Sequence, residues 1–248
     1  MTAGPFGGPS SAFAEPRDLL IVGAGGFARE AAQAVAAVNA AVGSGGGTGP
    51  AWRLLGFLDD DPQRKGERID GTEVLGGSEL VHAHPQAQVV VCVASPANLF
   101  SRARVVARLG LPEERYGTVI HPSAEVSRDS VVGPGTVLFA QTVLTASVRV
   151  GAHVAVMPQV VLTHDVVVGD FVTFASGVRL GGGVRLGRGA YLGAGSMLRE
   201  QISVGPWALV GMGSVVLGDV PQGEVWVGSP ARRLRSTVVP EDIESTAV

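Results

Sequence analysis

The sequence contains one pair of residues whose chemistry does not fit its surroundings, His164 and Asp165. They interrupt the apolar and glycine-rich stretch "VVLTHDVVVGDF". An imidazole titrates near neutral pH and can accept a proton from an attacking group, and a neighbouring carboxylate can hold it in one tautomer. The pair therefore predicts a general base, and the alternative is a solvent-exposed His–Asp pair with no function.

A second candidate site is the glycine turn at Gly23, Gly25 and Gly26, in "IVGAGGFARE". It follows a predicted buried strand over 18–23 and opens a predicted helix over 24–38. A helix N-terminus presents free N–H groups and a positive potential to a phosphate. Asp59 and Asp60 end the next predicted strand, so a nicotinamide dehydrogenase, with one of them on a ribose hydroxyl, is an alternative. Tight strand–helix packing without any ligand is another.

The elements that position His164 come from a repeat of six residues. Steps of six from Ile120 to Val216 meet an apolar residue at all seventeen positions, and steps of six from Ala124 to Val220 meet only small or aliphatic ones. Neither a helix nor a hairpin keeps this period, whereas a β-solenoid with one short strand and one corner per hexad does. Both rows are expected to point inward. Glycine often follows the first row, where we expect it to permit unusual backbone angles.

Three hexads are expected to close one triangular coil, so that residues eighteen apart lie side by side. This places Gly182 beside His164 and lets a thioester approach without meeting a side chain. His153 is expected to face a neighbouring chain, His121 to serve the solenoid entrance, and His82 and His84 to face solvent.

Composition limits the remaining possibilities. The net charge of −3 argues against a nucleic-acid partner, and the single cysteine, Cys92, excludes a disulfide framework or a Cys-rich zinc site. The sequence has no stretch of about 18 apolar residues, so it predicts no membrane span. We expect a soluble, cytoplasmic protein with a disordered lead-in over 1–17. A small βαβαβ domain is expected over 18–117, with a flexible loop over 39–50, a further strand in "AQVVVCVAS" and a helix in "ANLFSRARVVARLG". The solenoid is expected over 118–235, capped by the α/β unit at one end, and a tail over 236–248.

The hexads and the ending "VWVGSPARRLR" resemble the hexapeptide-repeat acyltransferases over roughly 120–235. The blocks "IVGAGGFARE", "LLGFLDDD" and "VIHPSAEV" extend this resemblance to bacterial sialic-acid O-acetyltransferases and nucleotide-amino-sugar N-acetyltransferases. The resemblance implies an α/β Rossmann-like unit followed by a left-handed parallel β-helix. It also implies a homotrimer, and direct transfer of acetyl from acetyl-CoA to an amine or hydroxyl of a sugar.

The resemblance also implies site residues. His164 would be the base and Asp165 its orienter, with Gly182 against the acetyl group, Ala194 and Gly211 along the pantetheine arm, and Arg232 and Arg233 at the CoA phosphates. A solvated basic tail is the alternative for the two arginines. Gly23, Gly25 and Gly26 would contact the sugar nucleotide's phosphates, and Asp59 or Asp60 its base or ribose. Relatives often carry histidine where Phe27 and Thr173 stand, so the sugar remains open.

Two alternatives remain at this stage. Zinc carbonic anhydrases share the solenoid but need three converging imidazoles, whereas only His153 and His164 lie within the repeat. No metal is therefore expected. A non-catalytic binding protein is the other alternative.

Overall fold

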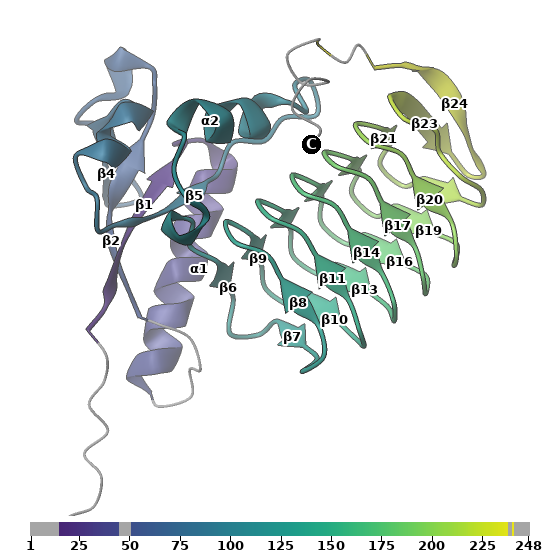
Figure 1. Cartoon of the computed structure of the whole chain (residues 1–248), viewed down its shortest axis with the longest axis horizontal. Helices are drawn as coiled ribbons and strands as arrows, with labels where there is room; N and C mark the ends of the chain where they lie inside the picture. Colours follow the sequence, from purple (N-terminus) through teal and green to yellow (C-terminus); the bar gives the residue numbers. More distant parts are fainter. Residues whose placement is uncertain (1–14, 45–50, 238–239, 241–248) are drawn as a thin grey trace, which may run out of the picture.

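An α/β unit and a parallel β-solenoid follow one another along the chain (Figure 1). The structure is a computed structural model that describes residues 15–44, 51–237 and 240. The predicted disordered lead-in falls outside these residues except for 15–17, and β1 already begins at Arg17. In the described part of the chain, no helix has the length and apolar character needed to cross a membrane.

The α/β unit is a five-stranded sheet with strand order β3-β4-β2-β1-β5. Its elements are β1 (Arg17–Val22), α1 (Gly26–Gly43), β2 (Trp52–Leu58), β3 (Arg68–Ile69), β4 (Thr72–Gly76), β5 (Gln88–Val91) and α2 (Ser101–Leu109), with 3₁₀ turns η1 (Pro62–Arg64), η2 (Ser78–His82) and η3 (Glu113–Arg115). The predicted βαβαβ order is wrong in one respect: β2, β4 and β5 are linked by the β3–β4 hairpin and 3₁₀ turns instead of a second crossover helix.

The first helix is longer than the sequence suggested. We expected α1 to end near Val38 and a flexible loop to begin at Asn39, but α1 runs to Gly43. The reason is tertiary, because the Asn39 side chain exchanges two hydrogen bonds of 2.7 Å with the backbone of Trp52. These bonds join the end of α1 to the start of β2.

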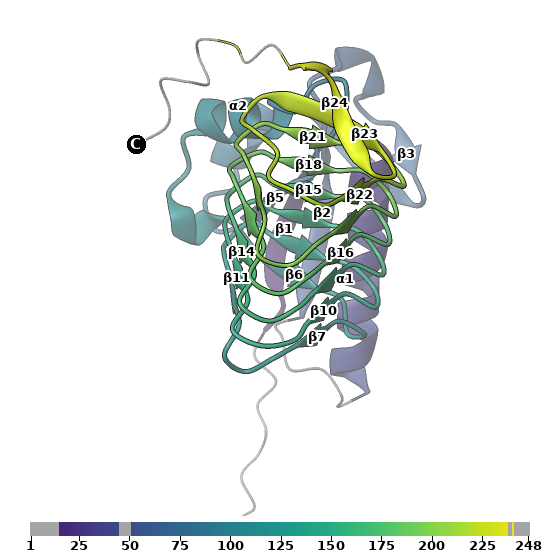
Figure 2. The ribbon, with the colours of Figure 1, turned by 90° about the vertical axis from the view of Figure 1, so that its right-hand side faces the viewer.

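The coils of the solenoid consist of two-residue strands that stack in three parallel sheets, and a hairpin of two longer strands ends the first of these sheets (Figure 2). Face one contains β6 (Val119–Ile120), β9 (Val137–Leu138), β12 (Ala155–Val156), β15 (Thr173–Phe174), β18 (Tyr191–Leu192), β21 (Leu209–Val210), β23 (Glu224–Gly228) and β24 (Ala231–Ser236). Face two contains β7 (Glu125–Val126), β10 (Val143–Leu144), β13 (Val161–Leu162), β16 (Arg179–Leu180), β19 (Met197–Leu198) and β22 (Val215–Val216). Face three contains β8 (Val131–Val132), β11 (Arg149–Val150), β14 (Val167–Val168), β17 (Arg185–Leu186) and β20 (Ser203–Val204).

The predicted coil of eighteen residues is confirmed by the strand register. Ala155 pairs with Thr173, and Thr173 pairs with Tyr191. The two predicted inward rows form one continuous core, with Leu162 and Phe174 fully buried. Ile120 is an exception at 37 % exposure, because it belongs to the first coil and no earlier coil covers it.

Glycine has two different roles at the corners, and the sequence suggested only one. The glycines after the apolar row, such as Gly151, do not have positive φ; a Cβ on Gly151 would lie 2.8 Å from the backbone nitrogen of Asp170 in the next coil. They are needed where adjacent coils approach closely. Positive φ falls two residues later, at Gly183 (φ 68°) and also at non-glycine residues such as Asp165 (φ 61°).

The α/β unit lies against the side of the solenoid and does not cap its first coil, in contrast to our expectation. Residues of α1 share a hydrophobic cluster with Val119, Val137 and Phe139 of face one, whereas Val131 in the first coil is 56 % exposed. The C-terminal hairpin β23–β24 covers the other end, where Trp226 and Ala231 pack on the core.

The junction between the two units buries His153, which we had expected to face a neighbouring chain. Its ring stacks on Phe171, with centroids 5.0 Å apart, and meets the edge of Tyr116 at 4.5 Å. Burial lowers the pKa of His153 to about 4; the cations Arg102 and Arg188 also lower it, while Asp170 raises it. The folded protein therefore holds this imidazole neutral.

This depressed pKa predicts a loss of stability in acid. Because the unfolded chain binds the proton with an ordinary pKa near 6.5, the stabilisation is complete above that pH and is lost as the pH falls toward 4. The loss is at most about 3 kcal/mol. Chemical denaturation of wild type and His153→Phe across this range should give a shallower pH dependence for the variant. Parallel profiles would contradict the assignment.

Candidate active site

His164 and Asp165 are the two turn residues of the corner between faces two and three, which follows β13. Asp165 adopts the left-handed conformation that this corner position requires. The His164 Nδ1 lies 2.9 Å from the Asp165 Oδ2. An ionised carboxylate can only accept, so Nδ1 carries the hydrogen and Nε2 keeps a free lone pair. The predicted orienting contact is thus present, and the basic nitrogen is Nε2.

Gly182 lies directly against that nitrogen, as the coil arithmetic predicted. It occupies the same corner one coil later, and a Cβ at this position would clash with the Nε2 and Cε1 atoms of His164. The Gly183 N–H donates to the carbonyl of His164 at 2.9 Å. The N–H of Gly182 has no acceptor among the described residues. A base and an unused backbone donor therefore lie side by side.

The other residues predicted to contact the cofactor lie elsewhere in the chain. Ala194 and Gly211 occupy the corner between faces one and two, on adjacent coils, and the Gly213 N–H donates to the carbonyl of Ala194 at 2.8 Å. Arg232 stands in β24 with Arg233, whose guanidinium pairs with Glu224 at 2.7 Å. Within one chain, these residues do not contact the turn that holds His164.

A cavity of about 270 Å³ lies at the junction of the two units, over face one. We call it the junction cavity, and its lining is largely apolar. The lining residues are Phe27, Ala94, Pro96, Ala155, Met157, Thr173, Ala175, Ser176, Tyr191 and Ala194. It lies beside the carboxyl ends of β1 and β5, the edge of a parallel sheet at which ligands commonly bind. His164 is not among its residues.

The predicted phosphate-binding turn is open. Gly23 has φ of 106°, and a Cβ there would lie 2.8 Å from the carbonyl oxygen of Cys92. A Cβ on Gly25 or Gly26 would meet nothing within 4 Å. No side chain caps α1 and no acidic residue occupies its first turn, so the first N–H groups of this helix have no side-chain partner among the described residues.

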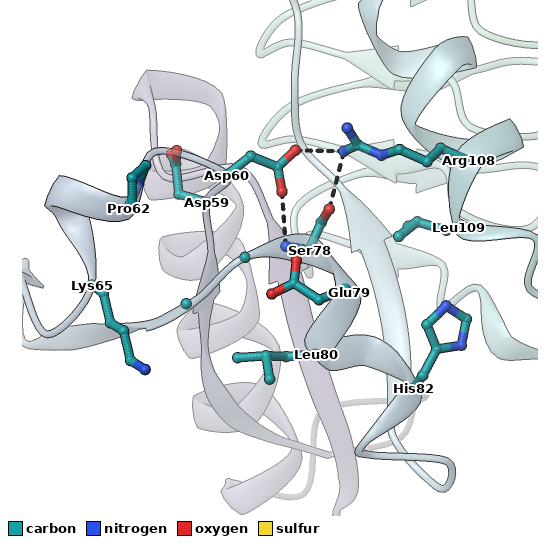
Figure 3. Close-up of a pocket in the computed structure, with 12 residues that line it drawn as sticks. Asp59, Asp60, Pro62, Lys65, Ser78, Glu79, Leu80, His82, Arg108 and Leu109 are labelled. Atoms are coloured by element: carbon teal, nitrogen blue, oxygen red, sulfur yellow. Dashed lines mark hydrogen bonds and ion pairs between the residues drawn. The ribbon is translucent and has the colours of Figure 1, made fainter.

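Asp59 and Asp60 line a larger cavity of about 560 Å³ at the ends of β2 and β4 (Figure 3). Asp60 accepts from the backbone of Ser78 at 2.9 Å and pairs with Arg108. Burial opposes its ionisation, but these bonds outweigh it and hold the pKa of Asp60 below its ordinary value. Asp59 pairs with Arg64 at 3.0 Å, and Arg64 also donates to the carbonyl of Ala24 in the glycine turn.

Arg102 is the residue near the junction cavity that the sequence analysis missed. It is 3 % exposed and reaches from α2 to the backbone carbonyl of Phe171 and the side chain of Thr173 in β15. Its position between the apolar residues Phe100 and Ala103 was the available signal, since an arginine on the apolar side of a helix needs a buried partner. In the described part of the chain, no three His, Cys, Asp or Glu side chains gather closely enough to hold a metal ion.

The close approach of Gly182 predicts the effect of a small substitution. Gly182→Ala would force the imidazole of His164 out of its place and break the contact from Nδ1 to Asp165, because the new methyl group takes the space of Nε2. Crystal structures would measure this. Gly218→Ala is the matched control, since a Cβ there meets nothing within 4 Å. An unmoved imidazole in Gly182→Ala would contradict the packing described.

Comparisons with known proteins agree with this architecture. Residues 18–109 match the PglD N-terminal domain family. A 73-residue segment is 36 % identical to UDP-N-acetylbacillosamine N-acetyltransferase of Bacillus subtilis; this segment is 26 % of the chain and 34 % of that enzyme's length.

Solved structures extend the similarity over the whole fold. The acetyltransferase domain of PglB from Neisseria gonorrhoeae, in complex with acetyl coenzyme A, is 28 % identical with a TM-score of 0.74, and the match covers 89 % of this chain and 100 % of that one. WeeI from Acinetobacter baumannii is 26 % identical with a TM-score of 0.69, over 87 % of this chain and 99 % of its own. Perosamine N-acetyltransferase from Caulobacter crescentus, in complex with CoA and GDP-perosamine, shares the fold at 23 % identity, with a TM-score of 0.75, over 88 % and 96 %. Residues 18–109 therefore resemble the PglD N-terminal domain, and the chain as a whole has an α/β unit followed by a left-handed β-helix, the fold of the sugar acetyltransferase structures to which it is similar, as the sequence indicated.

Proposed function

We propose that this protein transfers the acetyl group of acetyl-CoA to an amino group of a nucleotide-linked sugar. The observation that carries the proposal is the geometry of His164, with Nδ1 bound to Asp165 and Nε2 free beside Gly182. The relatives that act on a UDP-linked or GDP-linked amino sugar favour nitrogen as the acceptor atom and a nucleotide on the sugar. We also propose that residues 18–117 and 118–235 form two domains, which bind the sugar nucleotide and carry out the transfer.

The chemistry assigned to this corner is a direct transfer. The amine nitrogen attacks the thioester carbon, a C–N bond forms, and the N–H proton moves to His164 Nε2. As the C–S bond breaks, the sulfur leaves as a thiolate and takes that proton. The free N–H of Gly182 would donate to the thioester oxygen as charge develops on it. Asp165 would stabilise the imidazolium that forms between the two proton transfers.

The α/β unit is the proposed site for the sugar nucleotide. The open glycine turn at Gly23, Gly25 and Gly26 would receive the phosphates at the N-terminus of α1. The cavity beside Asp59 and Asp60 would take the base or ribose, and the junction cavity would take the sugar. A largely apolar lining with a few hydroxyl groups suits a sugar that has methyl groups in place of some hydroxyls.

The two halves of this site lie on opposite sides of one chain. The junction cavity is on face one, whereas His164 is on the corner between faces two and three, and a triangular coil sets that corner opposite face one. A trimer with cyclic symmetry would bring the corner of one subunit to face one of the next. Ala194 and Gly211 of the second subunit would then line the acetyl-CoA groove with Gly182 of the first, and Arg232 would reach the CoA phosphates.

Removal of the base gives the first test. His164→Ala should lower kcat for acetylation by roughly 10²–10⁴-fold, because general-base assistance is typically of that size. The fold should persist, since the His164 side chain is 62 % exposed in the single chain and contributes little packing there. A coupled assay of CoA release with size-exclusion chromatography would measure both. Unchanged turnover would overturn the proposed mechanism.

Hybrid trimers test the division of the site between subunits. Ala194→Trp would fill the junction cavity and His164→Ala would remove the base, so each homotrimer should be inactive. When the two variants are co-expressed, each mixed trimer has one interface of its three that pairs the intact histidine of one subunit with the intact cavity of the next. Such a trimer should therefore recover about a third of wild-type activity. If both halves came from one chain, no mixed trimer would be active.

A further inference from the structure

Thr173 is the polar side chain of the junction cavity whose environment is best defined. It begins β15 on face one, at the boundary between the solenoid and the α/β unit. Arg102 Nη2 donates to the hydroxyl oxygen of Thr173 at 2.7 Å. The same nitrogen lies 2.8 Å from the carbonyl oxygen of Phe171 and 3.1 Å from that of Val172. One buried side chain of the α/β unit therefore holds the start of β15.

Arg102 is a cation without a counter-ion. It is 3 % exposed, it pairs with no carboxylate in the described part of the chain, and its Nε and Nη1 atoms have no hydrogen-bond partner there. Burial lowers the pKa of Arg102 to about 10, so it stays charged at neutral pH. Burying a charge without a counter-ion costs free energy, which the three hydrogen bonds of Nη2 and the Phe27 ring, 5.9 Å from the guanidinium carbon, offset in part. Arg102 contacts two of the residues that line the junction cavity, Thr173 and Phe27.

The direction of the bond between Arg102 and Thr173 determines what the hydroxyl can do. A guanidinium has only donors, so Thr173 must accept in this bond, and its own hydrogen remains free. That hydrogen has no acceptor among the described residues. Because Thr173 lines the junction cavity, this hydrogen is available to an acceptor bound there. A neighbouring cation also polarises the O–H bond and makes it a stronger donor.

We propose that Thr173 is a specificity-determining residue that donates a hydrogen bond to a hydroxyl or acetamido oxygen of the sugar in the junction cavity, and that Arg102 is the positioning residue that aims it. This inference rests on the proposed function and adds to it the sugar group that is recognised. A sugar without an oxygen at that position would leave the hydroxyl unpaired and would be a poor substrate.

Thr173→Val tests the donor, because valine keeps the shape of the side chain and removes the hydroxyl. With acetyl-CoA and the best substrate from a panel of UDP-linked and GDP-linked 4-amino sugars, kcat/KM for the sugar should fall by about 10- to 100-fold, the cost expected for a charge-assisted hydrogen bond. KM for acetyl-CoA should stay the same. Thr173→Ser should restore kcat/KM to within about threefold of wild type, since it returns the donor.

Thr118→Val is the matched control. The Thr118 hydroxyl donates to the Gly133 carbonyl at 3.2 Å and does not line the junction cavity. Its loss should leave kcat/KM for the sugar unchanged. Three outcomes would overturn this inference and leave the proposed function standing. They are full activity of Thr173→Val, a Thr173→Ser variant that does not recover kcat/KM for the sugar, and a Thr173→Val variant in which only KM for acetyl-CoA rises. A wild-type protein that acetylates none of the sugars would overturn the proposed function, and the inference with it.

A double-mutant cycle tests the role of Arg102. If arginine acts through Thr173, Arg102→Met should lower sugar kcat/KM in the wild-type background and have little further effect beside Thr173→Val. Additive losses would overturn the positioning role. If Arg102→Met does not fold, Arg102→Lys, which keeps the charge but loses the planar donor geometry, should show the same non-additivity.

Discussion

The parallel register of eighteen residues between successive coils is the constraint on which the proposed site depends. It pairs Ala155 with Thr173 and Thr173 with Tyr191, and it sets Gly182 against His164. A shift of one residue would turn every apolar side chain out of the core. The buried rows therefore hold the register, and the register holds the corner at which the imidazole stands. The position of the exposed His164 turn therefore depends on packing in the centre of the solenoid.

The same geometry separates the two halves of the proposed site within one chain. A triangular coil separates a corner from the opposite face, and the α/β unit covers face one. The imidazole corner stays open while the junction cavity forms on the far side of the coil. Association of identical chains is a simple way to join the two halves, because cyclic symmetry presents the same corner to the same face at each interface.

The junction between the units buries an arginine and a histidine, whereas the polar side chains buried in the solenoid core are hydroxyl groups such as those of Thr142 and Ser196. Arg102 and His153 are both buried there, one kept charged and the other kept neutral. The aromatic rings of Tyr116 and Phe171 enclose His153, and Arg188 lies over the ring of Phe171 at 4.5 Å. Such an arrangement gives the α/β unit a defined position on face one, which is what a cavity shared by two units needs.

The amino-acid sequence by itself determined the solenoid, its coil length and the neighbours of His164, because these depend on a short period that repeats along the chain. The strand and glycine turn before α1 were also readable, since local preferences place them. Three features could not be predicted from the sequence: the end of α1, the β3–β4 hairpin in place of a second crossover helix, and the close approach of Gly151 to the next coil.

Only the tertiary structure decided the burial of His153, the partner of Thr173 and the existence of the junction cavity. Each joins residues far apart in the chain, such as Arg102 and Thr173. The physical reason is that a periodic pattern specifies contacts at a fixed separation, whereas the docking of one unit on another depends on surfaces that no period describes.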